Sequence, residues 1–205
     1  MLDAMPSLFE VETLMEPSEP PVQQSLFGDP QPIRVPAELW ELWLADEHVR
    51  ARYEAKVYRS PLLRCMYWTA GISSTGHASF RAGSLPGRTR RGTVPGHLYG
   101  YQLRHGVIPR LGWSLRSFTG AHTCDEASCQ NADHLRIVDV AENTAEWSER
   151  RRNPRGPLAD LRGPAGRSRA IATAIQAGLA AGEDEERVAA RVRAAQSAGL
   201  PLTLF

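Results

Sequence analysis

The chain has 205 residues, 42% of them apolar, and its formal net charge at pH 7 is only +1. This length predicts one domain with a tail or a small appendage. No apolar run approaches the roughly 18 residues that a membrane-spanning helix needs, and the acidic start of the chain is unlike a signal peptide. We therefore expect a soluble, intracellular protein.

The charge is unevenly distributed along the chain. Residues 1–33 hold six acids and no Lys or Arg, which leaves 17 acids against 24 bases in the remainder. Of those bases only Lys56 is a lysine, and arginine is the side chain best suited to bidentate contacts with phosphate. A basic body behind an acidic segment favours a polyanionic partner, although an Ala-, Arg- and Gly-rich composition also arises from codon usage.

Residues 1–35 are rich in Pro, Glu, Gln and Ser and show no sustained hydrophobic period, so we expect a disordered acidic tail. Its stretch QQSLF at 23–27 resembles the Gln-x-Ser-Leu-Phe peptide by which bacterial proteins bind the replication sliding clamp. Such peptides insert a Leu-Phe pair into an apolar groove, but a five-residue motif also occurs by chance. If the resemblance holds, the clamp is a partner and is contacted by Gln23, Ser25, Leu26 and Phe27.

The first stretch with helical periodicity covers residues 36–57. Pro36 suits the first position of a helix, and apolar side chains then recur on one face. Two of them, Trp40 and Trp43, are more typical of a buried core than of a platform for stacking bases. We predict one N-terminal helix that packs into the core.

Residues 65–119 alternate between short apolar runs and turns, which is typical of a β-rich segment. We predict strands at 65–69 and 77–81 joined by a Gly-rich turn, a short helix over 95–106, and strand character over 107–123. The loop 84–92 suits contact with a phosphate backbone, or is an ordinary solvated loop; its basic residues are Arg88, Arg90 and Arg91.

A longer helix is predicted from Asp139 to residue 152, because Asp139 and Glu142 form a capping-box-like pattern. After a Gly/Pro/Arg linker, two Ala-rich helices are predicted; they dock on DNA or brace the body, and their apolar stripes do not decide between these roles. The expected helices are at 168–181 and 184–198, and the expected organisation is a tail (1–35), a main domain (36–153) and a linker with a C-terminal helical extension (154–205).

Three cysteines cannot form a complete set of disulfides, and clustered Cys with His in an intracellular chain indicates a metal. Four residues separate Cys124 from Cys129, and four more separate Cys129 from His134. A structural zinc needs a fourth ligand, and Cys65 is the remaining cysteine. We predict a Cys₃His zinc site in preference to unrelated buried cysteines.

The run of residues 122–135, followed by Asn143, resembles the HNH, or His-Me finger (ββα-metal), endonucleases. It is most similar to their zinc-containing branch, common among homing and phage-borne enzymes. Upstream, the segment CMYWT at 65–69, the Gly76 turn, Phe80-Arg81 and the His97 segment are similar to the opening of that branch and its hairpin. The resemblance covers about residues 65–152 and implies an α+β fold: a ββα-metal core with structural zinc, a preceding β-hairpin, an N-terminal helix and a C-terminal helical pair.

The resemblance also implies roles for single residues. His122 matches the general base, because a neutral imidazole can take a proton from water. Asn143 matches the ligand of a catalytic Mg²⁺, an ion that prefers oxygen donors. Arg81, or else Arg88, matches the cation that contacts the phosphate, and the structural zinc ligands are Cys65, Cys124, Cys129 and His134.

Two departures from the branch concern loop geometry rather than the base or the metal ligands. Asn131 is followed by Ala132 where the branch has Asn-Pro, and His77 stands where its hairpin has tyrosine. Asp125 is a further metal ligand or, more typically for a surface acid, solvated. His97 contacts phosphate, orients another residue or, as we expect, lies in the core.

The predicted function is Mg²⁺-dependent hydrolysis of DNA phosphodiesters by a cytoplasmic enzyme of bacterial or phage origin, leaving 5′-phosphate and 3′-hydroxyl ends. The alternative is a non-catalytic, zinc-stabilised DNA-binding or clamp-adaptor module. A homodimer would suit cleavage of both strands of a palindromic site, but the sequence indicates neither the oligomeric state nor the target.

Overall fold

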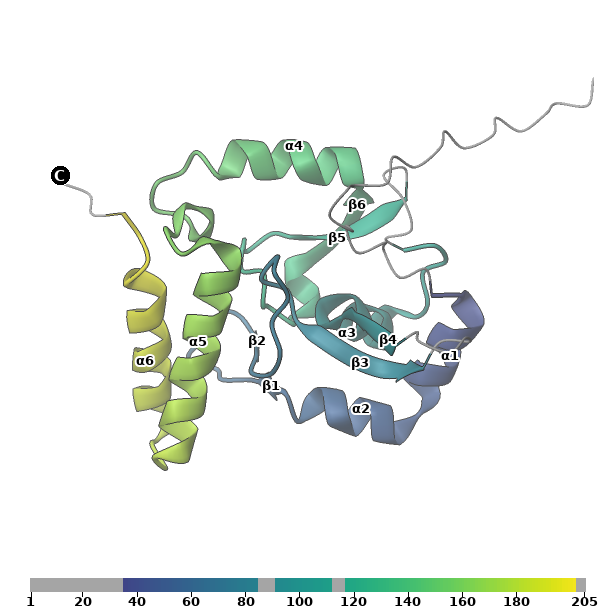
Figure 1. Cartoon of the computed structure of the whole chain (residues 1–205), viewed down its shortest axis with the longest axis horizontal. Coiled ribbons are helices and arrows are strands. Elements are labelled where there is room, and N and C mark those ends of the chain that lie inside the picture. Colours follow the sequence, from purple (N-terminus) through teal and green to yellow (C-terminus); the bar gives the residue numbers. More distant parts are fainter. Residues whose placement is uncertain (1–34, 85–90, 112–116, 202–205) are drawn as a thin grey trace, which may run out of the picture. The chain divides into compact units, whose positions relative to one another are not determined.

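Two short helices, α1 (Ala37–Ala45) and α2 (Glu47–Glu54), begin the part of the chain that this computed structural model describes, residues 35–84, 91–111 and 117–201 (Figure 1). One continuous helix was the wrong prediction, because Asp46 interrupts it with an extended backbone. The Asp46 carboxylate accepts hydrogen bonds from the backbone N–H groups of His48 and Val49, so it caps a new helix. The predicted burial of Trp40 and Trp43 is confirmed.

Three antiparallel strand pairs are present among the described residues. They are β1 (Val57–Tyr58) with β2 (Tyr67–Trp68), β3 (Ser79–Ser84) with β4 (Arg91–Pro95), and β5 (Phe118–His122) with β6 (Leu135–Asp139). The chain is thus mixed α+β, as predicted, with small sheets.

The expected pairing of 65–69 with 77–81 is wrong. β2 pairs with β1 instead, and the segment between β2 and β3 closes on itself through an isolated bridge from Ile72 to Ala78. β3 then pairs with β4, which buries Phe80 and Ala82 on its inner face. Turn residues in the sequence could not predict which strands pair, because the pairing of β3 with β4 depends on burying the face that carries Phe80 and Ala82.

The helix α3 (Gly96–His105) follows β4 directly, as predicted for 95–106. It ends at Gly106, whose φ of +87° is a left-handed conformation that favours glycine. Its first turn is buried and carries His97.

The strands β5 and β6 lead into α4 (Val140–Arg150). The predicted cap is confirmed, because the Asp139 carboxylate accepts a hydrogen bond of 2.7 Å from the backbone N–H of Glu142. In the ladder His122 lies opposite Leu135 at the end of β5, and Asn143 lies in the first turn of α4. A short 3₁₀ helix (Ala132–His134) joins the two strands.

The C-terminal part folds as a 3₁₀ turn (Pro157–Ala159) and two helices, α5 (Gly163–Ala180) and α6 (Glu185–Ser197), which lie side by side (Figure 1). α5 begins earlier than predicted, since Pro164 suits a first helical turn. The end of the expected linker 154–167 is therefore helical.

Buried side chains form two clusters. The first is aromatic and joins α1, α2, β3 and α3; it includes Val35, at the end of the segment expected to be disordered. The second joins α5 and α6 to the cysteines, since Ile171, Ile175, Val188 and Val192 pack with Cys65, Cys129 and Tyr67. The C-terminal helices therefore brace the cysteine cluster.

Within the described ranges, no helix is long and apolar enough to cross a membrane. The clamp-like peptide, with Gln23, Ser25, Leu26 and Phe27, lies outside the described residues, as do Arg88 and Arg90. Arg91 begins β4, and its side chain is likewise not described. Clamp binding and the role of this basic loop stay predictions.

Candidate functional site

Strand β2 brings Cys65 to the other two cysteines. The backbone N–H of Trp68 donates to the carbonyl of Ser128 at 3.1 Å, and the N–H of Gln130 donates to the carbonyl of Met66 at 2.7 Å. A bridge between Tyr67 and Cys129 completes this pairing. The upstream strand is thus fastened to the loop between β5 and β6, and residues distant in sequence share one cluster.

The structure assembles the predicted set of Cys65, Cys124, Cys129 and His134, whose ligand atoms all lie within 4.8 Å of one another. His134 Nδ1 is 3.6 Å from Cys65 Sγ and 3.5 Å from Cys129 Sγ. A tetrahedral zinc with ordinary bond lengths separates a sulfur and a nitrogen ligand by roughly 3.6 Å. The donor set and its spacing therefore fit a zinc ion.

The three thiols also shift one another's pKa values. Hydrogen bonds with Cys129 and Cys65 lower the pKa of the Cys124 thiol to about 2, whereas the hydrogen bond with Cys124 contributes most to raising the pKa of Cys65 to about 12. One thiolate is thus stabilised at the expense of its neighbours. A cation at the centre would stabilise all three in the ionised form that binds metal.

A buried ion-pair network connects this cluster to α5. Arg167 donates to both oxygens of Glu126, which lies between Cys124 and Cys129 in sequence, and to Asp160 at 3.2 Å. The side chains of Arg167, Glu126 and Asp160 are only 7%, 5% and 1% exposed. Paired and hydrogen-bonded charges of this kind fix the relative placement of the segments that carry them.

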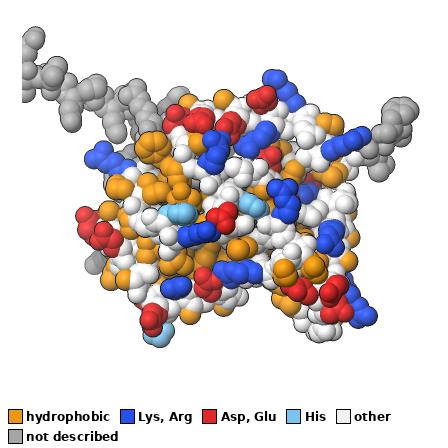
Figure 2. All heavy atoms as spheres, turned by 180° about the vertical axis from the view of Figure 1, so that it is seen from behind, with side chains coloured by type: hydrophobic (Ala, Val, Ile, Leu, Met, Phe, Trp, Pro, Cys, Tyr) orange, Lys and Arg blue, Asp and Glu red, His pale blue; other side chains and the backbone are white. Residues whose placement is uncertain are grey.

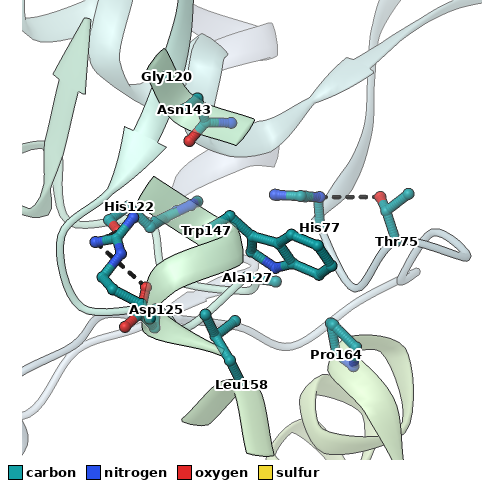
Figure 3. A pocket seen from close by; sticks show the side chains of 11 residues that line it. Thr75, His77, Gly120, His122, Asp125, Ala127, Asn143, Trp147, Leu158 and Pro164 are labelled. Atoms are coloured by element: carbon teal, nitrogen blue, oxygen red, sulfur yellow. Dashed lines mark hydrogen bonds and ion pairs between the residues drawn. The ribbon is translucent and has the colours of Figure 1, made fainter. Parts of the chain in front are cut away.

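A pocket of about 130 Å³ lies beside this cluster. It is lined by His122 from β5, by Asn143, Trp147 and Arg150 from α4, and by Asp125 (Figure 3). The turn before β3 and the first residues of α5 also line it, through Thr75, His77 and Pro164. The volume is enough for several water molecules, and hence for an ion with water or phosphate ligands.

The hydrogen bonding of His122 defines which of its nitrogens is available. The ring is buried, and Nε2 donates to the carbonyl of Cys129 at 3.1 Å. In the neutral ring this leaves Nδ1 as the acceptor. Burial lowers the pKa of His122 most strongly, although the nearby Cys124 opposes the shift. His122 is therefore a neutral imidazole at pH 7.

Asn143 and Asp125 bring oxygen donors to the same pocket. The Asn143 amide forms no hydrogen bond with another described side chain or backbone group, and Figure 3 shows it on the His122 side of the pocket. Asp125, expected to be solvated, is only partly so: its side chain is 18% exposed, and it pairs with Arg150 at 3.4 Å. Its φ of +59° is the left-handed conformation, which turns the loop into the pocket.

Arg150 is the arginine that the structure brings to the pocket. Its Nη1 donates to the backbone carbonyl of His122 at 3.1 Å, and it pairs with Asp125 and Glu146. Arg81, the first expectation for a phosphate contact, is exposed on β3 and does not line the pocket.

On the face shown in Figure 2, basic and acidic side chains are interspersed, so charge there does not mark a path for DNA.

Comparison with protein-family models, with characterised proteins and with solved structures found no match. The geometry of the pocket and of the cysteine cluster is therefore what indicates function.

Sequence reasoning missed His77, Trp147 and Arg150 as pocket residues. Arg150 and Trp147 fall three or four residues apart on one helix with Asn143, so a helical projection of α4 could have grouped them. One feature of the sequence could have drawn attention to His77: it stands where the hairpin of the similar branch has a tyrosine. Gly76 explains how the turn reaches the pocket, because its φ is +87° and a Cβ there would lie 2.7 Å from the Pro164 backbone.

Proposed function

We propose that the protein is a Mg²⁺-dependent DNA endonuclease of the HNH, or His-Me finger, kind, with His122 as the general base. The observation that carries this proposal is that His122 and Asn143, from different elements, line one pocket. The sequence resemblance pairs these same two residues as base and metal ligand.

The framework around them supports the proposal. β5, β6 and α4 follow one another along the chain, with only a loop and a short 3₁₀ helix between the two strands, which is the order of a ββα-metal core. In that core the base lies on the first strand and the amide ligand on the helix, the positions of His122 and Asn143. The Cys₃His cluster fastens the connection between the two strands, where a structural zinc would hold the base in place.

The proposed chemistry begins with a water molecule in the pocket. His122 Nδ1 takes its proton while the water oxygen attacks the phosphorus, and the bond from phosphorus to the 3′-oxygen breaks. The leaving oxygen takes a proton from solvent, giving 5′-phosphate and 3′-hydroxyl ends. The hydrogen bond from His122 Nε2 to the Cys129 carbonyl fixes the ring so that Nδ1 is the free nitrogen.

Oxygen donors suit the metal that this chemistry needs. Asn143, with its unengaged amide, would hold Mg²⁺, which otherwise keeps water or phosphate oxygens as ligands. A bound Mg²⁺ supplies positive charge against the phosphate and the leaving oxygen. Arg150 acts as a positioning residue through its bond to the His122 carbonyl.

The proposal is tested by incubating the purified protein with plasmid and Mg²⁺ and comparing it with His122→Ala. We expect cleavage by the wild type and a rate lower by about 10²- to 10⁴-fold in the variant, the usual contribution of a general base. His48→Ala is the matched control, because His48 is exposed on α2 and should cut normally. Absence of Mg²⁺-dependent cleavage of supercoiled, linear or single-stranded DNA by the wild type would overturn the proposal, and equal DNA binding by both proteins would then favour a non-catalytic module.

A further inference from the structure

Three histidines from separate elements meet on the inner side of the pocket. They are His77 from the turn before β3, His97 from the first turn of α3 and His122 from the end of β5. One ring nitrogen from each lies within 4.8 Å of the others. The ring centroids are 4.7 Å apart for His77 and His97, 4.8 Å for His97 and His122, and 5.7 Å for His77 and His122.

Hydrogen bonds occupy the outer nitrogens of two of these rings. His77 Nδ1 lies 2.9 Å from the hydroxyl of Thr75, which leaves its Nε2 available. His122 Nε2 donates to the Cys129 carbonyl, which leaves its Nδ1. Histidines that bind metals typically donate the other ring N–H to a carbonyl, hydroxyl or carboxylate in this way, which fixes the tautomer.

The third ring carries an unexplained polar atom. His97 is 4% exposed, and its Nδ1 is buried without a hydrogen-bond partner. A buried nitrogen with no partner loses its hydrogen bonds to water, which is unfavourable. Ring stacking alone gives this nitrogen no hydrogen-bond partner, so His97 is a buried polar side chain that apolar packing does not explain.

From this geometry we propose a second metal site, formed by His77, His97 and His122 and distinct from the Cys₃His cluster, which binds a first-row transition-metal ion such as Zn²⁺. Three imidazoles suit Zn²⁺, Co²⁺ or Ni²⁺, whereas Mg²⁺ prefers oxygen. The fourth position would face the pocket that His77 and His122 line, as in zinc sites that keep one position open to water or substrate.

The charge state of the rings supports the proposal. Burial is the largest cause that lowers the pKa of His77, to about 4, and it also lowers the pKa of His97. These two rings are therefore neutral near pH 7, the form in which imidazole binds metal. A tetrahedral zinc would hold its nitrogen ligands roughly 3.3 Å apart, so binding would draw the three rings closer together.

The site has a consequence for the proposed reaction, and this consequence rests on the proposed function. An ion bound at His122 Nδ1 occupies the nitrogen that would accept the proton from water. Transition-metal binding and use of His122 as a base therefore exclude each other, so Zn²⁺ should inhibit cleavage supported by Mg²⁺. The binding itself is measured without DNA, so its failure is distinguishable from failure of the nuclease proposal.

The test is calorimetric titration with Zn²⁺ of protein already carrying one zinc per chain. We expect the wild type to bind one further equivalent. His77→Phe, which keeps a ring but removes both nitrogens, should lose this second equivalent and retain the first, which shows that it is folded. Thr75→Val, which removes only the hydroxyl beside His77, should weaken binding about 10-fold, and the exposed His48→Ala should bind like the wild type.

Titration of Co²⁺ into protein that already carries one zinc per chain locates the added ion. Coordination by nitrogen gives ligand-field absorption without thiolate charge transfer, and we expect this spectrum from the second equivalent. Three results would overturn the proposal. They are failure of the wild type to bind a second equivalent of metal, equal loss of the second equivalent in His48→Ala and His77→Phe, and thiolate charge transfer from the added Co²⁺.

Discussion

At the scale of single residues, the two ring nitrogens of His122 have different environments. His122 Nε2 is fixed to the Cys129 carbonyl, and Nδ1 stays available for a proton or an ion. Cys129 also belongs to the cysteine cluster. The orientation of the proposed base therefore depends on the loop that carries the cysteine cluster, to which His122 is joined by this hydrogen bond.

Asn143→Ala tests the oxygen donor. The variant lacks the amide that would hold Mg²⁺, so we expect strongly reduced cleavage, with partial recovery as the Mg²⁺ concentration is raised. Asn143→Asp keeps an oxygen donor and should recover part of the activity. Rates of plasmid cleavage over a Mg²⁺ series measure both effects, and unchanged cleavage by Asn143→Ala at low Mg²⁺ would contradict the assignment.

Substitutions of Arg150 and Arg81 test which of the two arginines supports the proposed cleavage. Arg150 lines the pocket and holds the His122 carbonyl, whereas Arg81 is exposed outside it. We expect Arg150→Ala to lower the cleavage rate roughly 10²-fold, because even a small displacement of a catalytic group costs about that much, and Arg81→Ala to have a smaller effect. A larger loss of cleavage rate in Arg81→Ala would instead favour Arg81 as the phosphate contact expected from the sequence.

At the scale of elements, the start of α4 controls where Asn143 lies. Asp139→Ala removes the side-chain cap to the Glu142 N–H and should lower the free energy of unfolding by about 1 kcal/mol. Asp139→Ser, which can still cap, should lose much less. Chemical denaturation measures both, and equal losses in the two variants would show that the cap is not the cause.

Elements with a local signal were predictable from sequence. The cap at Asp139, the helix after Pro95 and the buried face carrying Trp40 and Trp43 depend on residues close to one another in the chain. The cysteine spacing likewise predicted a cluster that the structure assembles. Strand partners were not predictable in this way, because β3 pairs with β4 to bury Phe80, a choice made by tertiary packing.

The pocket residues were likewise predictable only where a local motif marked them. His122 and Asn143 were found from a motif, whereas Arg150 and His77 reach the pocket through contacts between distant segments. Asp46 is an intermediate case, since its side chain carried a capping signal that the apolar period of the surrounding helix obscured.

At the scale of the whole molecule, α5 and α6 support the cysteine cluster through both apolar packing and the network of Arg167, Glu126 and Asp160. Burial raises the pKa of Asp160, but hydrogen bonds from Arg162 and Arg167 outweigh it, and the net pKa lies below 3.8. A lowered carboxylate pKa stabilises the folded state above the unfolded value, and this stability is lost as the pH falls through the folded pKa.

This predicts a pH-dependent difference between the wild type and Asp160→Asn. Near pH 7 the wild type should be more stable, because only the carboxylate forms ion pairs with both arginines. The difference should shrink as the pH falls below about 3.8, the ordinary value for this carboxyl, since protonation removes the same charge. Thermal unfolding across the pH range measures it, and a constant difference would contradict the pairing.

The most direct test of the central claim measures zinc content and Mg²⁺-dependent plasmid cleavage on the same chelator-washed preparations of wild type, His122→Ala and Cys129→Ser. We predict that the wild type retains one zinc per chain and cuts. His122→Ala should retain its zinc and its fold but fail to cut, whereas Cys129→Ser should lose zinc, fold and cleavage together. Cleavage by His122→Ala at the wild-type rate would contradict the account.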